Sequence, residues 1–125
     1  MHKTFNMSEV KITNKMVKIQ KKDVEGSGVK LFIEEEGVEV ARAFFYILKN
    51  DLHEKPFGLM EDVFVVEEKR KGGYGTLIVK AVIEEAKKRQ CYKLVGTSRY
   101  EREKVHEFYK NLGFKDWGKE FRMNF

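Results

Sequence analysis

Apolar and polar residues alternate through the first half of the chain, a pattern typical of β-strands that bury one face. Residues 10–20 alternate in two short bursts and predict one strand or two, and residues 23–28 favour a turn. Residues 29–35 and 38–48 then predict a hairpin that reverses at Glu36-Gly37. The first half of the chain is therefore expected to be β-structure.

A strand, a helix and another strand are predicted in the second half of the chain. Residues 59–66 are apolar on both faces apart from two carboxylates, which predicts a central strand covered on both sides. Apolar residues recur at helical spacing from Leu77 to Ala86, and residues 92–98 predict the next strand. Because a helix that joins two strands of one sheet usually brings them parallel, this unit predicts a parallel crossover.

A second helix and a closing hairpin are predicted near the end of the chain. The helix carries an apolar stripe from Val105 to Leu112 and stops at Gly113, a residue suited to a helix C-terminus. Residues 114–117 and 120–125 predict two short strands. The expected fold is a mixed α/β sheet with roughly six or seven strands and two main helices, in a single domain that spans residues 1–125.

Composition places the chain among ordinary globular domains. Its 125 residues are 42% hydrophobic and 13% aromatic, enough to bury a core without disulfides or metals. A lone cysteine cannot form an internal disulfide, and no apolar stretch is long enough for a signal peptide or a membrane span, so we expect a cytoplasmic protein. His2, His53 and His106 lack metal-ligand spacing, which predicts no metal site.

The net charge of +5 suggests an anionic ligand or partner. The lysines are spread along the chain, whereas a nucleic-acid-binding domain needs a clustered positive face with exposed aromatics for stacking. A nucleic-acid partner is therefore disfavoured, and charge alone names no other partner.

The candidate binding motif is RKGGYG, residues 70–75, between the predicted central strand and the first helix. A P-loop would need a lysine where this chain has Thr76, and a dinucleotide-binding loop would need a small residue where it has Ile78. The first backbone N–H groups of a helix have no partner within the helix. Glycines at this place let a phosphate approach these groups closely. The motif suits a pyrophosphate, although a plain tight turn explains these six residues equally well.

Two adjacent carboxylates, Glu61 and Asp62, are the candidates for proton transfer. Carboxylates in an apolar strand are costly unless they line a wet cleft or pair with cations. A carboxylate in such a cleft can take a proton from a bound substrate. Alternation points the two side chains to opposite faces, so one of them, with Glu61 favoured, is expected to face the substrate. Alternatively, both mark a solvated start of the strand or pair with lysines.

Two separated motifs resemble the GNAT superfamily of N-acetyltransferases. Arg70, Gly73 and Gly75, placed between an apolar strand and an apolar helix, are similar to its coenzyme A loop, and HEFYKNLGF, residues 106–114, is similar to its Phe-Tyr-x-x-x-Gly-Phe signature. The resemblance covers residues 59–125 and is nearest to the glucosamine-phosphate N-acetyltransferases and small-amine acetyltransferases. It implies the GNAT fold, with a V-shaped splay between two strands, and transfer of an acetyl group from acetyl-CoA to a primary amine of a small molecule or a protein.

The resemblance also implies roles for individual residues. Tyr109 would be the general acid beside the leaving sulfur, and a backbone N–H near Val65 would stabilise the developing oxyanion. The catalytic candidates are thus Tyr109, Glu61 and Asp62. The cofactor-binding candidates are Val63, Phe64, Val65, Val66, Arg70, Lys71, Gly72, Gly73, Tyr74, Gly75, Thr76 and Tyr109. From the residues alone Tyr109 is a core residue, since it shares an apolar stripe with Phe108.

One departure from the family pattern concerns the acceptor site. GNAT domains usually insert two helices after the first strand, and residues 20–28 leave no room for them. The acceptor site is then open or completed by a second subunit, which leaves open both a homodimer and the identity of the acceptor. A non-catalytic acyl-CoA-binding module is the main alternative, because it would keep the glycine motif but would not need the three catalytic candidates.

Overall fold

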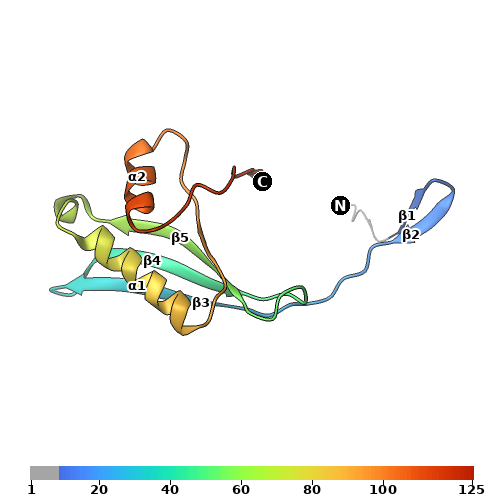
Figure 1. Cartoon of the computed structure of the whole chain (residues 1–125), viewed down its shortest axis with the longest axis horizontal. Coiled ribbons are helices and arrows are strands. Elements are labelled where there is room, and N and C mark those ends of the chain that lie inside the picture. Colours follow the sequence, from blue (N-terminus) through green and yellow to red (C-terminus); the bar gives the residue numbers. More distant parts are fainter. Residues whose placement is uncertain (1–8) are drawn as a thin grey trace, which may run out of the picture.

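The computed structural model describes residues 9–125, whose strands form two separate sheets. The small sheet pairs β1 (Glu9–Ile12) with β2 (Lys15–Lys18). The larger sheet has the order β3 (Gly26–Glu35), β4 (Val38–Leu48), β5 (Phe57–Val65) and β6 (Leu94–Gly96). The helical elements are the short 3₁₀-helix η1 (Glu67–Lys69), α1 (Tyr74–Lys88) and α2 (Glu103–Asn111) (Figure 1). This mixed arrangement confirms the predicted α/β fold class.

The hairpin predicted for residues 29–48 is confirmed as β3 and β4. The strands pair antiparallel, and the chain reverses at Glu36 and Gly37, which have positive φ angles of 52° and 77°. Two consecutive residues with positive φ match the right-handed twist of the flanking strands, and glycine adopts this conformation without steric cost. The turn sets the register that leaves Glu35 at the end of β3.

The core lies between α1 and one face of the larger sheet. Phe45 on β4 and Val79 and Val82 on α1 have fully buried side chains. Apolar residues at helical spacing give α1 one buried face, as predicted from the sequence. Phe108 of α2 and Leu112, the residue that follows this helix, pack against the edge of the same core, so both predicted helices are confirmed.

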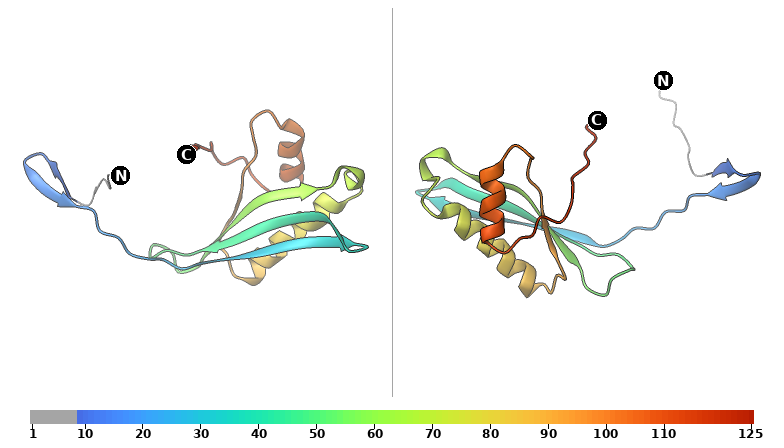
Figure 2. Two further views of the ribbon diagram at one scale, coloured as in Figure 1. Left: turned by 180° about the vertical axis from the view of Figure 1, so that it is seen from behind. Right: turned by 45° about the horizontal axis from the view of Figure 1, so that its top comes forward.

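The opposite face of the larger sheet carries no helix of the described chain (Figure 2). Phe32 on β3 and Phe64 on β5 remain 50% and 39% exposed. The prediction that β5 is covered on both sides is therefore wrong: β5 is an inner strand, but both helices pack on the other face. Arg42 on β4 partly screens this open face, since its guanidinium carbon lies 4.8 Å from the centroid of the Phe64 ring.

β5 and β6 run parallel, as predicted, but their pairing is short. It ends where Met60 lies opposite Gly96, and β5 then continues to Val65 with no strand of the described chain on that side. β6 itself has only three residues, fewer than the sequence predicted. The pairing of β5 with β6 therefore ends early, which agrees with the V-shaped splay between two strands that the resemblance implied.

A β-bulge interrupts β5 at one of the candidate carboxylates. Asp62 and Val63 together lie opposite Ala43 of β4, and Asp62 has a positive φ of 51°. The extra residue changes the alternation of side chains. Glu61 pairs with Phe44 on the open face, whereas Val63 packs against the core. Regular alternation, which was assumed from the sequence, does not predict this bulge.

The C-terminal segment differs from the prediction. Residues 114–125 form no strand, so the predicted closing hairpin is wrong. Trp117, Phe121, Met123 and Phe125 are all exposed. Alternating apolar residues make a stable strand only beside other strands or a packed face, and no described strand pairs with this segment.

The N-terminal part of the described chain forms two strands, one of the two alternatives that the sequence predicted. Residues 10–20 contain two short strands, β1 and β2, rather than one. No α-helix precedes α1 in residues 9–73, in agreement with the expected lack of a helix pair. Neither α1 nor α2 is long and apolar enough to cross a lipid bilayer.

Candidate functional site

The glycine motif forms the loop that leads into α1. Gly73 is the N-cap residue of α1 and has a φ of 90°, in the left-handed region, and no side chain caps this end of the helix. Within the described residues, no acceptor binds the backbone N–H groups of Lys71, Gly73, Tyr74, Gly75 and Thr76. Because free N–H groups at a helix N-terminus carry partial positive charge, this end of α1 can bind an anion.

The glycines of the loop are there for different reasons. Gly73 is favoured by its left-handed backbone conformation, which glycine adopts most easily. Crowding is not the reason, because a Cβ there would meet nothing within 4 Å. A Cβ on Gly72 would approach the carbonyl oxygen of Lys69 to 3.3 Å. A Cβ on Gly75 would make only ordinary contacts, the nearest at 3.7 Å from Cζ of Phe108, and this backbone is helical. The fold therefore does not itself require glycine at position 75.

Arg70 is folded back onto β5. Its Nε donates a hydrogen bond to the carbonyl oxygen of Val65 at 2.9 Å, and its guanidinium carbon lies 5.4 Å from the centroid of the Phe64 ring. The N–H of Val66 donates to the carbonyl oxygen of Val40 at 2.9 Å. Main-chain groups of Val65 and Val66, two of the predicted cofactor-binding residues, are thus already engaged within the fold.

Glu35, which the sequence did not mark as a site residue, holds the loop from the neighbouring hairpin. One oxygen of its carboxylate accepts a hydrogen bond from the hydroxyl of Tyr74, and the other lies 2.9 Å from Nζ of Lys69. Tyr74, a predicted cofactor-binding residue, therefore uses its hydroxyl inside the protein. Glu35 and Tyr74 are 39 residues apart, so no local motif could reveal their contact.

The charges of this cluster shift the pKa values of its members in consistent directions. The hydrogen bond from Tyr74, and then that from Lys69, lowers the pKa of Glu35. The hydrogen bonds to Glu35 raise the pKa values of Lys69 and Tyr74. At neutral pH Glu35 is therefore ionised, Lys69 is protonated and Tyr74 is a neutral donor, which is the charge pattern that holds the three together.

Tyr109 on α2 packs between two other aromatic rings. The centroid of its ring lies 5.6 Å from that of Phe108 and 5.4 Å from that of Phe114. Burial raises the pKa of Tyr109, Arg102 opposes this shift, and the negative charge of Glu61 adds to it. Tyr109 therefore keeps its proton at neutral pH and lies within electrostatic reach of Glu61.

The two candidate carboxylates have different surroundings. Glu61 is half-buried beside Phe44 on the open face of the sheet, at the point where β5 and β6 separate. Asp62 is exposed at the bulge. The two carboxylates therefore differ in burial, and Glu61, unlike Asp62, contributes to the pKa shift of Tyr109.

Other sequence features lie away from the loop. The surface has one shallow hollow on the outer face of α2 and another between β3 and α1. Nε2 of His106 contacts the carbonyl oxygen of Arg99 at 2.7 Å. Cys91 has a free thiol whose pKa is raised by burial. No group of metal ligands occurs among the described residues, and His2 lies outside them.

Comparisons with known proteins give a consistent result. Residues 5–114 match the model of a family described as "Acetyltransferase (GNAT) family". A putative acetyltransferase from Agrobacterium tumefaciens is 30% identical with a TM-score of 0.73, over 78% of this chain and 68% of that chain. An acetyltransferase from Trypanosoma brucei is 25% identical with a TM-score of 0.73, over 78% and 69% of the two chains. Glucosamine-6-phosphate N-acetyltransferase from Arabidopsis thaliana is 26% identical with a TM-score of 0.72, over 78% and 67%.

No protein of curated function is similar enough in sequence to count as a match. The family model nevertheless spans both motifs on which the resemblance was based, the glycine loop and residues 106–114. The solved structures share the arrangement of sheet and helices, and three of them are named as acetyltransferases. The chain therefore belongs to the GNAT family of acetyltransferases.

Proposed function

We propose that the protein is an acetyl-CoA-dependent N-acetyltransferase that acetylates a primary amine of a small molecule or of a protein. The observation that carries this proposal is the set of unpaired N–H groups at the start of α1. A bound diphosphate would satisfy these donors and would benefit from their partial charge. A ligand close to the backbone would also account for Gly75, because the fold has room for a Cβ at this position and alanine would favour the helix more than glycine does.

The free edge of β5 supports a place for the pantetheine arm. Beyond Met60 this edge has no strand partner in the described chain, so its main-chain groups can pair with the amides of the arm. Arg70 holds the carbonyl oxygen of Val65. We expect Arg70 to leave Val65 when acetyl-CoA binds, which would free both the carbonyl group for the arm and the guanidinium for a phosphate.

Acetyl transfer needs a base, a donor to the oxyanion and a donor to the leaving sulfur. The amine nitrogen forms a bond to the thioester carbonyl carbon, and the carbon–sulfur bond breaks. The ammonium first gives one proton to Glu61 or Asp62, directly or through water. The nitrogen loses its second proton to water as the carbon–sulfur bond breaks, while a backbone N–H near Val65 stabilises the oxyanion. Tyr109 hydrogen-bonds to the leaving sulfur, which takes its proton from water. Because burial raises the pKa of Tyr109 further above that of a thiol, the hydrogen bond is the role we assign to it.

The open face of the sheet is the proposed approach for the acceptor. Glu61 lies on this face opposite Phe44, and Tyr46 is 39% exposed two residues further along β4. Phe44 thus lies directly opposite the carboxylate that would take the proton, and Tyr46 lies opposite Leu59 on the same face. The acceptor is proposed here only as a primary amine, since the Arabidopsis enzyme named for glucosamine 6-phosphate shares 26% of its residues with this chain.

Thermal unfolding with and without acetyl-CoA tests the binding step. A ligand at 100 times its Kd adds about 2.7 kcal/mol of stability and should raise the midpoint, whereas ATP at the same concentration controls for a general effect of polyanions. Release of free thiol from acetyl-CoA is then measured with polyamines, amino sugars and lysine peptides. An unchanged midpoint would overturn the proposal, and binding without thiol release would favour a non-catalytic acyl-CoA-binding module.

A further inference from the structure

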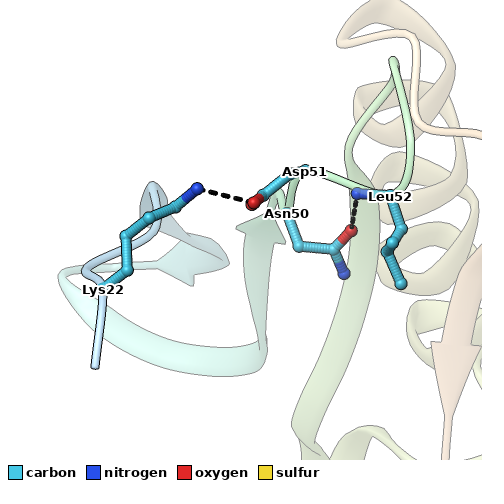
Figure 3. A network of polar contacts seen from close by, with 4 residues as sticks. All are labelled: Lys22, Asn50, Asp51 and Leu52. Atoms are coloured by element: carbon cyan, nitrogen blue, oxygen red, sulfur yellow. Dashed lines mark hydrogen bonds and ion pairs between the residues drawn. The ribbon is translucent and has the colours of Figure 1, made fainter. Parts of the chain in front are cut away.

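The hairpin of β1 and β2 lies apart from the rest of the protein (Figure 1). Its strands pair only with each other, and residues 19–25 connect it to β3 as an extended segment without a turn. An ion pair of 2.6 Å between Lys22 and Asp51 holds this segment at the β4–β5 loop (Figure 3). The hairpin therefore points away from the sheet of its own chain.

One face of the hairpin is mainly apolar. Val10 pairs with Val17 and Ile12 pairs with Lys15 on this face, whereas Glu9, Lys11, Met16 and Lys18 lie on the other. The side chains of Ile12 and Val17 are 54% and 36% exposed. A two-stranded hairpin is at best marginally stable in water and needs further strands or a packed face. We therefore expect this hairpin to bind another surface.

The free edge of β3 offers a matching surface. β3 is the outermost strand of the larger sheet, and on one side no strand of the described chain pairs with it. A mainly apolar hollow lies beside this edge, lined by Leu31, Phe32 and Ile33 of β3 and by Leu77, Ile78 and Ala81 of α1. Lys30 also lines it, and its charge is paired with Glu39. A hairpin added here would extend the hydrogen-bonded sheet and cover the hollow with its apolar face.

Charge complementarity favours the same pairing. Residues 9–22 contain five lysines and one acidic residue, whereas the end of β3 and the following turn carry Glu34, Glu35 and Glu36 in succession. Glu35 is engaged by Lys69, but Glu34 and Glu36 form no ion pair with any described residue. Lysines of the hairpin would thus meet carboxylates that remain available.

We propose that the protein forms a symmetric dimer in which the hairpin of each copy adds to the β3 edge of the other. The chain does not make this contact with itself, because the linker runs away from β3 and is held at Asp51. A reciprocal exchange closes with two-fold symmetry and occupies both hairpins and both edges, which leaves no site for a third copy. The dimer is independent of the proposed enzymatic activity.

Size-exclusion chromatography with light scattering, on the full chain, tests this proposal. We expect a particle of twice the 14.8 kDa chain mass. Lys15→Glu/Lys18→Glu reverses charge on the hairpin, and should raise the dimer Kd at least about tenfold. Lys104→Glu/Lys110→Glu makes the same change of net charge on exposed positions of α2 and should leave the dimer intact.

A second variant, Glu34→Lys/Glu36→Lys, separates exchange between copies from folding back within one chain. Alone it should weaken the dimer as the hairpin variant does. Mixed with the hairpin variant it should restore the dimer mass, because in the mixed dimer each hairpin meets an edge of opposite charge. Circular dichroism checks that both variants are folded, as expected for changes outside the core. A monomeric natural chain, a dimer that survives both reversals, or a mixture that stays monomeric would each overturn the proposal.

Discussion

Nζ of Lys69 lies 2.9 Å from the carboxylate of Glu35, so the end of β3 is joined to the segment that leads into the glycine loop. Tyr74, the first residue of α1, bonds to the same carboxylate from the far side of the loop. Residues 70–73 are thus held at both ends by one side chain of a neighbouring strand. Donors that are already fixed in place bind an anion with less loss of entropy than donors on a mobile loop.

Glu35→Gln tests the contribution of this anchor, because it removes the charge and keeps the size of the side chain. We expect the Kd for acetyl-CoA to rise about two- to fivefold, a modest effect because solvent weakens exposed ion pairs. Titration calorimetry measures the change, and Glu84→Gln on the exposed side of α1 is the matched control. Equal affinity in the two variants would mean that the loop keeps its shape without Glu35.

The same carboxylate predicts a pH dependence of stability. Its pKa is lowered, first by the bond from Tyr74 and then by that from Lys69, so folding favours the ionised form. The resulting stability is fully present above the pKa of glutamate in the unfolded chain and is lost as pH falls through the lowered pKa of the folded protein. The difference in thermal midpoint between the natural chain and Glu35→Gln should be constant down to about pH 5 and shrink below it. A difference that widens in acid would contradict this assignment.

Gly75→Ala separates the needs of the fold from those of the ligand. The added methyl group would come no closer than 3.7 Å to the protein, and alanine favours a helix. The free energy of unfolding should therefore be unchanged or higher by about 0.5 kcal/mol. The methyl group would stand between the backbone and the diphosphate, so the Kd for acetyl-CoA should rise at least about tenfold. Urea unfolding and calorimetry measure the two effects, with Gly118→Ala as control, and normal binding by Gly75→Ala would count against the loop as the binding site.

Tyr109→Phe tests the hydrogen bond to the leaving sulfur. The ring and its packing against Phe108 and Phe114 are kept, so acetyl-CoA should bind as before, while turnover falls about tenfold or more. Thiol release at saturating acetyl-CoA measures the rate. Tyr100→Phe, at a position that is 71% exposed, serves as the control. If Tyr109→Phe turns over at the natural rate, Tyr109 is a core residue and not a catalytic one.

Gly58→Ala tests the packing of the core beneath the site. A Cβ at this position would stand 2.4 Å from Cε2 of Phe45, a side chain with no exposed surface. The ring cannot stay where it is, so we expect a loss of about 1–3 kcal/mol in the free energy of unfolding. Urea unfolding measures it against Gly118→Ala, whose Cβ would meet nothing within 4 Å. Natural stability in Gly58→Ala would mean that the core has room that the structure does not show.

Elements that rest on local interactions could be predicted from the sequence. The turn residues Glu36 and Gly37 predicted the β3–β4 hairpin. Apolar residues at helical spacing, followed by Gly113, predicted α2. The glycine loop was also recognisable, because the left-handed backbone conformation at the N-cap position of α1 favours glycine. These features depend on neighbours in the sequence, which is why single-sequence patterns reveal them.

Features that depend on distant segments could not be predicted. The contact of Glu35 with Tyr74 joins a strand end to a helix start across the fold. The bulge at Asp62 depends on the register against β4, and the exposure of Phe64 depends on which face the helices cover. Residues 120–125 have the alternation of a strand but lack a neighbouring strand in the described chain. In each case the sequence pattern covers a few neighbouring residues, whereas the strand or side chain that decides the structure lies far along the chain.

The central claim is that the free N–H groups at the start of α1 bind the diphosphate of acetyl-CoA. Titration of isotope-labelled protein with acetyl-CoA, followed through its amide NMR signals, tests this most directly. We expect saturable shifts that are largest for Gly73, Gly75 and Thr76, with smaller changes for residues on the outer face of α2. Saturable binding that leaves these three signals unmoved, or no binding at all, would contradict the claim.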